Sequence, residues 1–180
     1  HPTPRFWKRF RIFTKLLKRK KIIDIACGTG RDAVIFEKAG FDYTGIDNSA
    51  GMLREARKRS KTAKFLLMDF YNLKFKPETF DGFWAAAALL HVPKRRVRKV
   101  LQNIKNIIKS GGVGFISLKE KRSIGEGMVR ETKWGGIQRY FAFYTDKQFL
   151  KILHDAGFSV IRHLRIKGSS ETWLWYFVRK

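Results

Sequence analysis

Two glycines and an aspartate are spaced so that they could hold a polar ligand. Gly28 and Gly30 follow the apolar run 22–27, and Asp47 closes the next apolar run, nineteen residues after Gly28. Glycine lets the backbone turn tightly and approach a ligand closely. An ionised carboxylate accepts hydrogen bonds from two adjacent hydroxyls, as on a ribose, more strongly than a neutral group does. The spacing therefore predicts a site for a nucleoside-bearing cofactor.

Two further aspartates narrow the class of cofactor. The glycine pattern, which continues to Ala33, also satisfies the dinucleotide fingerprint. However, Asp24 lies inside the first apolar run, where a buried carboxylate needs a partner. Asp69 closes a third apolar run, so that three successive predicted strands carry an acid at or near their carboxyl ends. Parallel sheets bind ligands at that edge, and the pattern favours a cofactor other than a dinucleotide.

The elements around these residues alternate between strand and helix. Apolar periodicity predicts the strands and helices of an α/β protein. The expected helices are 31–40, 49–60, 93–109 and 145–156, and the expected later strands are 80–86, 112–118, 158–165 and 172–178. A length of 180 residues with 44% hydrophobic content fits one domain, 1–180. Residues 1–20 are expected to form a basic helix with an apolar stripe at positions 6, 10, 13 and 17.

From about Lys21 to Leu118 the chain resembles the class I S-adenosylmethionine-dependent methyltransferases, within the broad group called methyltransferase type 11. The resemblance implies a Rossmann-like methyltransferase fold, with a seven-stranded, mostly parallel sheet, an antiparallel last strand and helices on both faces. It also implies an enzyme that uses S-adenosyl-L-methionine.

The resemblance also implies roles for single residues. The segment Asp24 to Gly30 matches the motif around the methionine part of the cofactor, and Arg31 falls where relatives often meet its carboxylate. Asp47 matches the acid that holds the ribose, Asp69 and Phe70 match the pair that reads adenine, and Met52 falls on the adenine face. Ala85 matches a carbonyl that faces the cofactor amine. The expected cofactor-binding set is Asp24, Ala26, Gly28, Thr29, Gly30, Arg31, Asp47, Asn48, Met52, Asp69, Phe70 and Ala85.

Catalytic residues are less clearly marked. The segment after the fourth strand lacks the Asn/Asp-Pro-Pro-aromatic motif of base N-methylation, and Cys27 lies in the glycine turn, far along the chain from where a thiolate nucleophile is needed. If a proton must leave the acceptor, His91 is the first candidate base; alternatively, it caps a helix or packs beside Pro93. Lys119 and Tyr140 are further candidates, and no metal site is expected.

The net charge of +24 suggests a polyanionic partner. The basic residues cluster in 1–21, 54–64 and 94–109, where they outnumber a single acid, Glu55. Phosphate neutralisation needs many lysines and arginines, so RNA is a possible acceptor or partner. The alternatives are a small-molecule methyltransferase with a solvated basic surface, an anionic membrane surface as the partner, and a catalytically silent RNA-binding module with the same fold.

Residues 119–139 are expected to form a glycine-containing insertion, either a lid loop or a surface excursion. Cys27 is the single cysteine, which rules out an intramolecular disulfide. Apolar runs are too short for a membrane span, and a cytoplasmic enzyme is the expectation.

Overall fold

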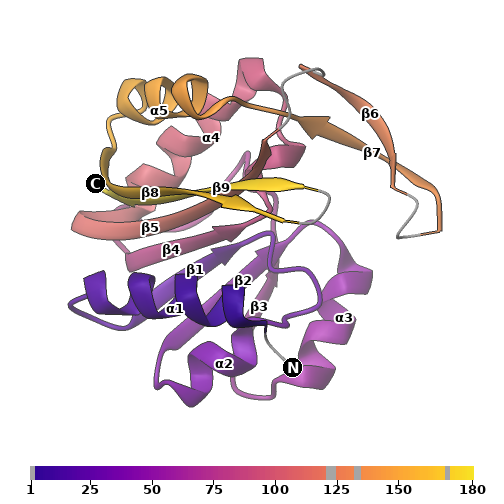
Figure 1. The fold of residues 1–180 in the computed structure, drawn as a ribbon. Coiled ribbons are helices and arrows are strands. Elements are labelled where there is room, and N and C mark those ends of the chain that lie inside the picture. The colour runs from indigo at the N-terminus through magenta and orange to yellow at the C-terminus, as the bar shows by residue number, and fades with distance from the viewer. Residues whose placement is uncertain (1–2, 121–124, 132–134, 169–170) are drawn as a thin grey trace.

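The computed structural model describes residues 3–120, 125–131, 135–168 and 171–180. Helices and strands alternate along the chain, as Figure 1 shows. In chain order they are α1 (Pro4–Leu16), β1 (Lys21–Ile25), α2 (Ala33–Lys38), β2 (Asp42–Asp47), α3 (Ala50–Arg59), β3 (Lys64–Leu67), β4 (Phe80–Ala86), the 3-10 turn η1 (Leu89–His91), α4 (Lys94–Ile107), β5 (Ile108–Glu120), β6 (Glu126–Glu131), β7 (Ile137–Ala142), α5 (Asp146–Asp155), β8 (Ser159–Lys167) and β9 (Thr172–Arg179).

Within the described residues, seven strands form one sheet in the order β3-β2-β1-β4-β5-β9-β8. The first five are parallel, whereas β9 runs antiparallel to both of its neighbours, β5 and β8. This confirms the predicted mostly parallel sheet with an antiparallel last strand. Because parallel strands end on the same side, the residues that follow β1 to β5 meet at one edge, where parallel sheets bind ligands.

Helices cover both faces of this sheet, as expected. In Figure 1, α1, α2 and α3 lie on one side and α4 and α5 on the other. The alternation of side chains along the strands supplies both layers: Ile22 and Trp84 belong to the core under α1 and α2, whereas Ile23 and Phe83 belong to the core under α4 and α5. The sheet therefore has no face left for solvent along its central strands, which explains their continuous apolar sequences.

The amphipathic N-terminal segment forms a helix that is part of the core. Thr3 caps α1 by accepting a hydrogen bond from the Phe6 backbone N–H, and Pro4 occupies the first turn, where its missing N–H costs nothing. Phe6, Phe10 and Phe13 are buried. The Phe13 ring lies 5.3 Å from the Trp84 ring and 6.0 Å from the Phe36 ring, measured between centroids. α1 is therefore packed against the sheet, with Phe13 in contact with β4.

In the described part of residues 119–139, strands occupy much of the segment in which a loop was expected, and its role as a lid stays a prediction. Lys119 and Glu120 complete β5, and the described part of the rest contains β6 and the start of β7, which pair antiparallel. Trp134, which belongs to the expected insertion, lies outside the described residues. Charged residues and Gly127 are poor strand formers, so the sequence gives little sign of this hairpin. Across the described residues, every helix is too short or too polar to cross a lipid bilayer.

We predict that Phe13→Ala lowers the free energy of unfolding by about 3–5 kcal/mol, since it removes a fully buried aromatic ring. Urea unfolding followed by far-UV circular dichroism measures this loss. The matched control is Lys15→Ala on the exposed side of α1, for which a change within about 0.5 kcal/mol is expected. Equal, small effects of both substitutions would show that α1 does not belong to the cooperative core.

Candidate functional site

The turn after β1 combines a crowded glycine with an open one. Ala26, Gly28 and Gly30 have φ values of 57°, 56° and 68°, a region that strongly favours glycine. A Cβ on Gly30 would lie 2.9 Å from the Ala56 Cβ, so Gly30 permits α3 to pack against the turn. A Cβ on Gly28 would have no described atom within 4 Å. Gly28 therefore presents bare backbone to open space, as a ligand-binding turn requires.

Asp47, the last residue of β2, ties this turn to the start of α3. Its Oδ2 accepts a hydrogen bond from the Gly28 N–H at 2.9 Å, and its Oδ1 accepts one from the Ser49 N–H, also at 2.9 Å. Each carboxylate oxygen can accept more than one hydrogen bond, so both oxygens keep capacity for hydroxyl donors. The two backbone donors fix the orientation of the carboxylate before any ligand arrives.

The residues after β3 adjoin this carboxylate. The Met68 N–H donates to the Asp47 carbonyl at 3.0 Å, which holds the chain leading to Asp69 beside the end of β2. The Asp69 side chain is exposed, and its Oδ1 accepts from the Tyr71 N–H at 2.8 Å. Met52 is also exposed, at 46%. The sheet edge thus offers two carboxylates and an exposed apolar side chain, a set suited to a sugar and a flat base.

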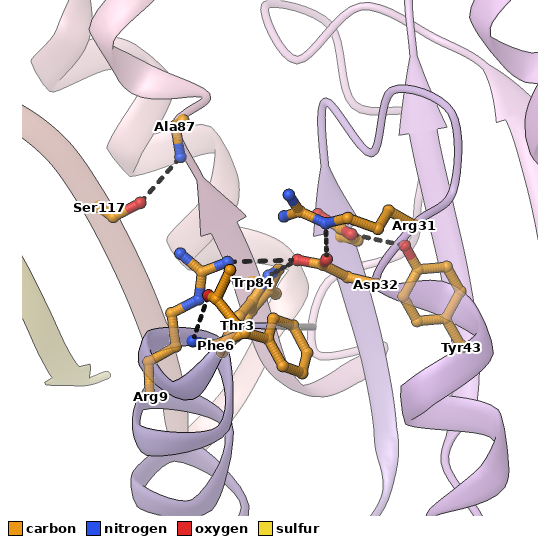
Figure 2. Close-up of polar contacts among 10 residues, drawn as sticks. Thr3, Phe6, Arg9, Arg31, Asp32, Tyr43, Trp84, Ala87 and Ser117 are labelled. Atoms are coloured by element: carbon orange, nitrogen blue, oxygen red, sulfur yellow. Dashed lines mark hydrogen bonds and ion pairs between the residues drawn. The ribbon is translucent and has the colours of Figure 1, made fainter. Parts of the chain in front are cut away.

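Buried polar residues gather on the side of the turn that faces α1, as Figure 2 shows. The Tyr43 hydroxyl donates to Asp24 Oδ2 at 2.5 Å, which supplies the partner that the sequence requires for Asp24. Burial, together with the nearby Asp32 carboxylate, raises the pKa of Asp24 well above its usual range. Asp32 precedes α2 and accepts from Arg31 Nε at 2.7 Å and from Trp84 Nε1 at 3.0 Å.

Asp32 and Arg9 lie beside the predicted turn, and the sequence analysis did not include them in the candidate site. Arg9 comes from α1, and one of its terminal nitrogens lies 3.8 Å from Asp32 Oδ2. The available signal was the position of Arg9, one residue before Phe10 on a helix whose aromatic stripe is buried. A charged residue at the margin of such a stripe is buried only if a group of opposite charge lies nearby. For Arg9 this group is Asp32, which the sequence around Arg9 does not reveal.

The end of β4 carries a strained backbone. Ala85 is fully buried, and Ala87 has a φ of 58°. The Ala87 N–H donates to Ser117 Oγ at 2.9 Å, which holds this conformation against β5 (Figure 2). Positive φ at a residue with a Cβ costs free energy and often marks a functional site. Two such residues, Ala26 and Ala87, therefore follow the adjacent strands β1 and β4.

His91 contacts β7 through both ring nitrogens. Nδ1 lies 2.8 Å from the Tyr140 carbonyl oxygen, and Nε2 lies 2.6 Å from Arg139 Nη2. Since a guanidinium only donates, Nε2 accepts, and the proton of the neutral ring belongs on Nδ1. Burial lowers the pKa of His91, and the Arg139 charge adds to this effect. The ring is therefore held neutral, which is the form that can accept a proton. Its Nε2 lone pair already accepts a hydrogen bond from Arg139.

Lys119 and Tyr140 are engaged as well. Lys119 Nζ lies 2.8 Å from Glu171 Oε1 and 3.4 Å from Glu131 Oε1, and Glu131 also pairs with Arg139 at 2.8 Å. The Tyr140 hydroxyl donates to Glu126 Oε2 at 2.5 Å. Burial and this hydrogen bond raise the pKa of Tyr140 to about 12. The structure thus gathers the three predicted base candidates near the β6–β7 hairpin.

A glycine turn after β1, a fixed carboxylate after β2 and a second acid after β3 together define a Rossmann-like domain of the kind that binds a nucleoside cofactor at its sheet edge. The chain matches the family described as "Methyltransferase domain" over residues 22–112 of 180, and it belongs to this family. Membership in this family favours the methyltransferase interpretation of the glycine motif over the dinucleotide-binding one.

Individual relatives agree with this family. The chain is 33% identical over 95 residues to a demethylmenaquinone methyltransferase of Thermotoga maritima, a match that covers 52% of this chain and 41% of that protein. The chain spans less than half the length of this relative.

Solved structures confirm the class I fold. A SAM-dependent methyltransferase from Methanosarcina mazei superimposes with a TM-score of 0.82 at 19% identity, covering 94% of this chain and 96% of that one. A 1,6-didemethyltoxoflavin-N1-methyltransferase from Burkholderia thailandensis, solved with 1,6-didemethyltoxoflavin and S-adenosylhomocysteine bound, gives 0.78 at 20% identity, covering 94% and 75%.

The lowered pKa of His91 predicts a pH-dependent contribution to stability. The folded protein binds the His91 proton less readily than the unfolded chain, so this contribution is present above pH 6.5 and is lost as the pH falls below it. We expect wild type to lose stability relative to His91→Gln below about pH 6.5, by at most about 1.4 kcal/mol per pH unit. Urea unfolding at several pH values measures the difference; parallel profiles for the two proteins would contradict it.

Proposed function

We propose that this chain binds S-adenosyl-L-methionine and transfers its methyl group to an acceptor. The observation that carries the proposal is the Asp47 carboxylate, which two backbone N–H groups fix beside the open backbone of Gly28. The residues present fit the cofactor: a fixed carboxylate suits the ribose hydroxyls, and a turn without a side chain admits the ligand. A buried guanidinium nitrogen of Arg9 that lacks a partner among the described residues suits an anionic group.

The proposed contacts follow from the positions of the residues. Asp47, followed by Asn48, would hold the ribose. Asp69 and the Phe70 N–H would read adenine, with Met52 against its face. The turn would hold the methionine part, with Arg31 on the carboxylate and the Ala85 carbonyl on the amine. Asp24, Ala26, Thr29 and Gly30 shape that turn.

The cofactor, when bound, supplies a methyl group on a positively charged sulfur. The task of the protein is then to hold a nucleophile in line with that methyl group and to exclude water, and such positioning can supply on the order of 7–11 kcal/mol. Where the acceptor must lose a proton, His91 is the proposed base. This role requires that the acceptor replace the Arg139 guanidinium at Nε2. Lys119 pairs with two glutamates, and Tyr140, with a pKa of about 12, stays protonated near neutral pH and so does not accept the proton.

A small molecule is the acceptor that we infer from the names of similar proteins. Demethylmenaquinone and 1,6-didemethyltoxoflavin stand in the names of two similar proteins, and the β6–β7 hairpin beside the base candidates is the proposed lid over such an acceptor. A cytoplasmic location, expected from the single cysteine, belongs to the same proposal.

We predict that Asp47→Ala weakens binding of S-adenosylhomocysteine at least tenfold, because charged hydrogen bonds contribute about 1.5–3 kcal/mol. Isothermal titration calorimetry measures the affinity. Asp42→Ala, at the opposite end of the same strand, is the matched control and should bind like wild type, since Asp42 is exposed and pairs only with Lys64 in the described chain. Absence of binding by wild type would instead favour the catalytically silent RNA-binding module.

RNA is a second candidate acceptor or partner, and α4 favours it. One face of this helix buries Val97, Leu101 and Ile104, whereas Arg95, Arg98 and Lys99 are exposed on the other. No acid interrupts 94–109, so this face can approach phosphates without repulsion. The basic side chains of 54–64 and of α1 lie on the opposite face of the sheet (Figure 1) and would form a separate contact.

If RNA binds through α4, replacing Arg95, Arg98 and Lys99 with Gln should lower the slope of log affinity against log salt by about two, given about 0.7 per phosphate on single strands. Fluorescence anisotropy with a labelled oligouridylate across a salt series measures this slope. Replacing Arg162, Lys167 and Arg179, which are exposed on β8 and β9, gives a control of equal charge with an unchanged slope. A flat salt dependence of the wild-type protein would refute binding through phosphates.

A further inference from the structure

Four of the seven Asn and Gln residues of the chain line one cleft. This amide cleft lies between α4 and the segment that leads from β3 to β4, and its volume is about 320 Å³. Its four amide side chains are Asn72, Gln102, Asn103 and Asn106. Ligand pockets in proteins start at about 300 Å³, so the cleft can admit a small planar molecule. None of its lining residues belongs to the proposed cofactor contacts.

The amides are held in place but keep hydrogen-bonding capacity. Asn103 Nδ2 donates to the Tyr71 carbonyl oxygen at 2.9 Å, which joins the two walls of the cleft. The side chains of Asn72, Gln102 and Asn106 are exposed and have no hydrogen-bond partner in the described part of the chain. The three amides of α4 are three or four residues apart, so they share one face of the helix. The cleft therefore offers a row of side-chain amides to a ligand.

The cleft also combines apolar surface with positive charge. Leu73 and Ile107 supply the apolar part of the lining, and Lys99 supplies an ammonium group. At the Tyr71 end, the Arg96 guanidinium carbon lies 3.6 Å from the centre of the Tyr71 ring, which fixes a second cation beside the cleft. No carboxylate is among the described residues that line it. An anionic group bound here would thus meet attraction without a repelling charge in the lining.

This chemistry fits a nucleotide better than a bare anion or a lipid chain. An amide places a carbonyl acceptor next to NH₂ donors, and the edges of nucleobases likewise present donors and acceptors side by side. A bare anion would use the donors only, and a lipid chain would use neither. The apolar lining suits the faces of a base ring, and the two cations suit the neighbouring phosphates. Proteins read single-stranded RNA through base edges and position it through phosphates.

We propose that the amide cleft binds a nucleobase of a single-stranded RNA whose phosphates lie along the basic face of α4. This inference rests on the RNA contact of α4 proposed above and adds base recognition to it. Lys99 belongs to both parts, since it lines the cleft and is one of the exposed cations of α4. Phosphate contacts alone carry no sequence information, so the amides are what would make one base preferred over another.

The test compares an oligouridylate with an abasic ribose-phosphate strand of equal length, which keeps the charges but lacks the bases. We expect wild type to bind the oligouridylate at least fivefold more tightly by fluorescence anisotropy. Gln102→Met combined with Asn106→Leu keeps the side-chain volumes and the net charge. It should weaken oligouridylate binding at least fivefold and leave both the abasic affinity and the salt slope unchanged. Gln138→Met, an exposed amide on β7, is the matched control and should bind like wild type.

The other outcomes refute distinct statements. Equal wild-type affinity for the two strands would overturn base recognition and leave the phosphate contact of α4 standing, whereas binding of neither strand would overturn the RNA contact itself. Equal losses for both strands in the double variant would overturn the role of the amides. Uridine monophosphate that competes as well as the whole strand would assign the cleft to a free nucleotide and overturn RNA as its occupant.

A single substitution keeps the proposal testable if the double variant fails to fold. Gln102→Ala removes one exposed amide from α4, and alanine is the best helix former. This variant should weaken oligouridylate binding at least twofold with abasic binding unchanged. Wild-type affinity for the oligouridylate would refute a role for Gln102 in the cleft.

Discussion

The geometry of the sheet edge depends on the hydrogen bonds that the Asp47 carboxylate accepts from Gly28 and Ser49. These bonds connect the turn after β1 to the start of α3 across the end of β2. They also satisfy backbone N–H groups that the turn and the helix start would otherwise leave without partners. The same carboxylate that suits a ribose is thus a structural cap. This dual role fixes the site in advance, so that a ligand need not order it.

The parts of the fold and site that could be predicted from the sequence are those encoded by residues close together in the chain. The strands, the turn and the aspartates at their ends are encoded by short patterns: Asp24 to Gly30 and Asp47 lie within 24 residues of one another. Apolar runs that need burial on both faces predicted central parallel strands, and the resemblance implied seven strands with the last antiparallel; both are confirmed. Boundaries were less accurate: β5 begins at Ile108 instead of residue 112, and α2 covers only Ala33–Lys38 of the expected 31–40.

What the sequence did not reveal depends on contacts between distant segments. Trp84 and Asp32 meet 52 residues apart, and no local pattern at either position announces the contact. Arg9 was counted among nine basic residues of a run interpreted as a solvated or RNA-facing helix, because charge in a sequence does not tell which side chain turns inward. The β6–β7 hairpin is stabilised by ion pairs such as Glu131 with Arg139, which the mixed charge of the segment does not distinguish from a solvated loop.

Cys27 lies in the same turn, with its sulfur close to Gly45, where an added Cβ would approach to 2.8 Å. Burial raises the pKa of this partly exposed thiol, so near neutral pH it stays protonated and reacts slowly with alkylating reagents. Because it is the single sulfhydryl of the chain, its labelling rate reports only on this place. The rate at which Cys27 is alkylated therefore measures local opening of the turn. The same rate, measured with a ligand added, shows how far the ligand slows that opening, and no labelling site has to be introduced.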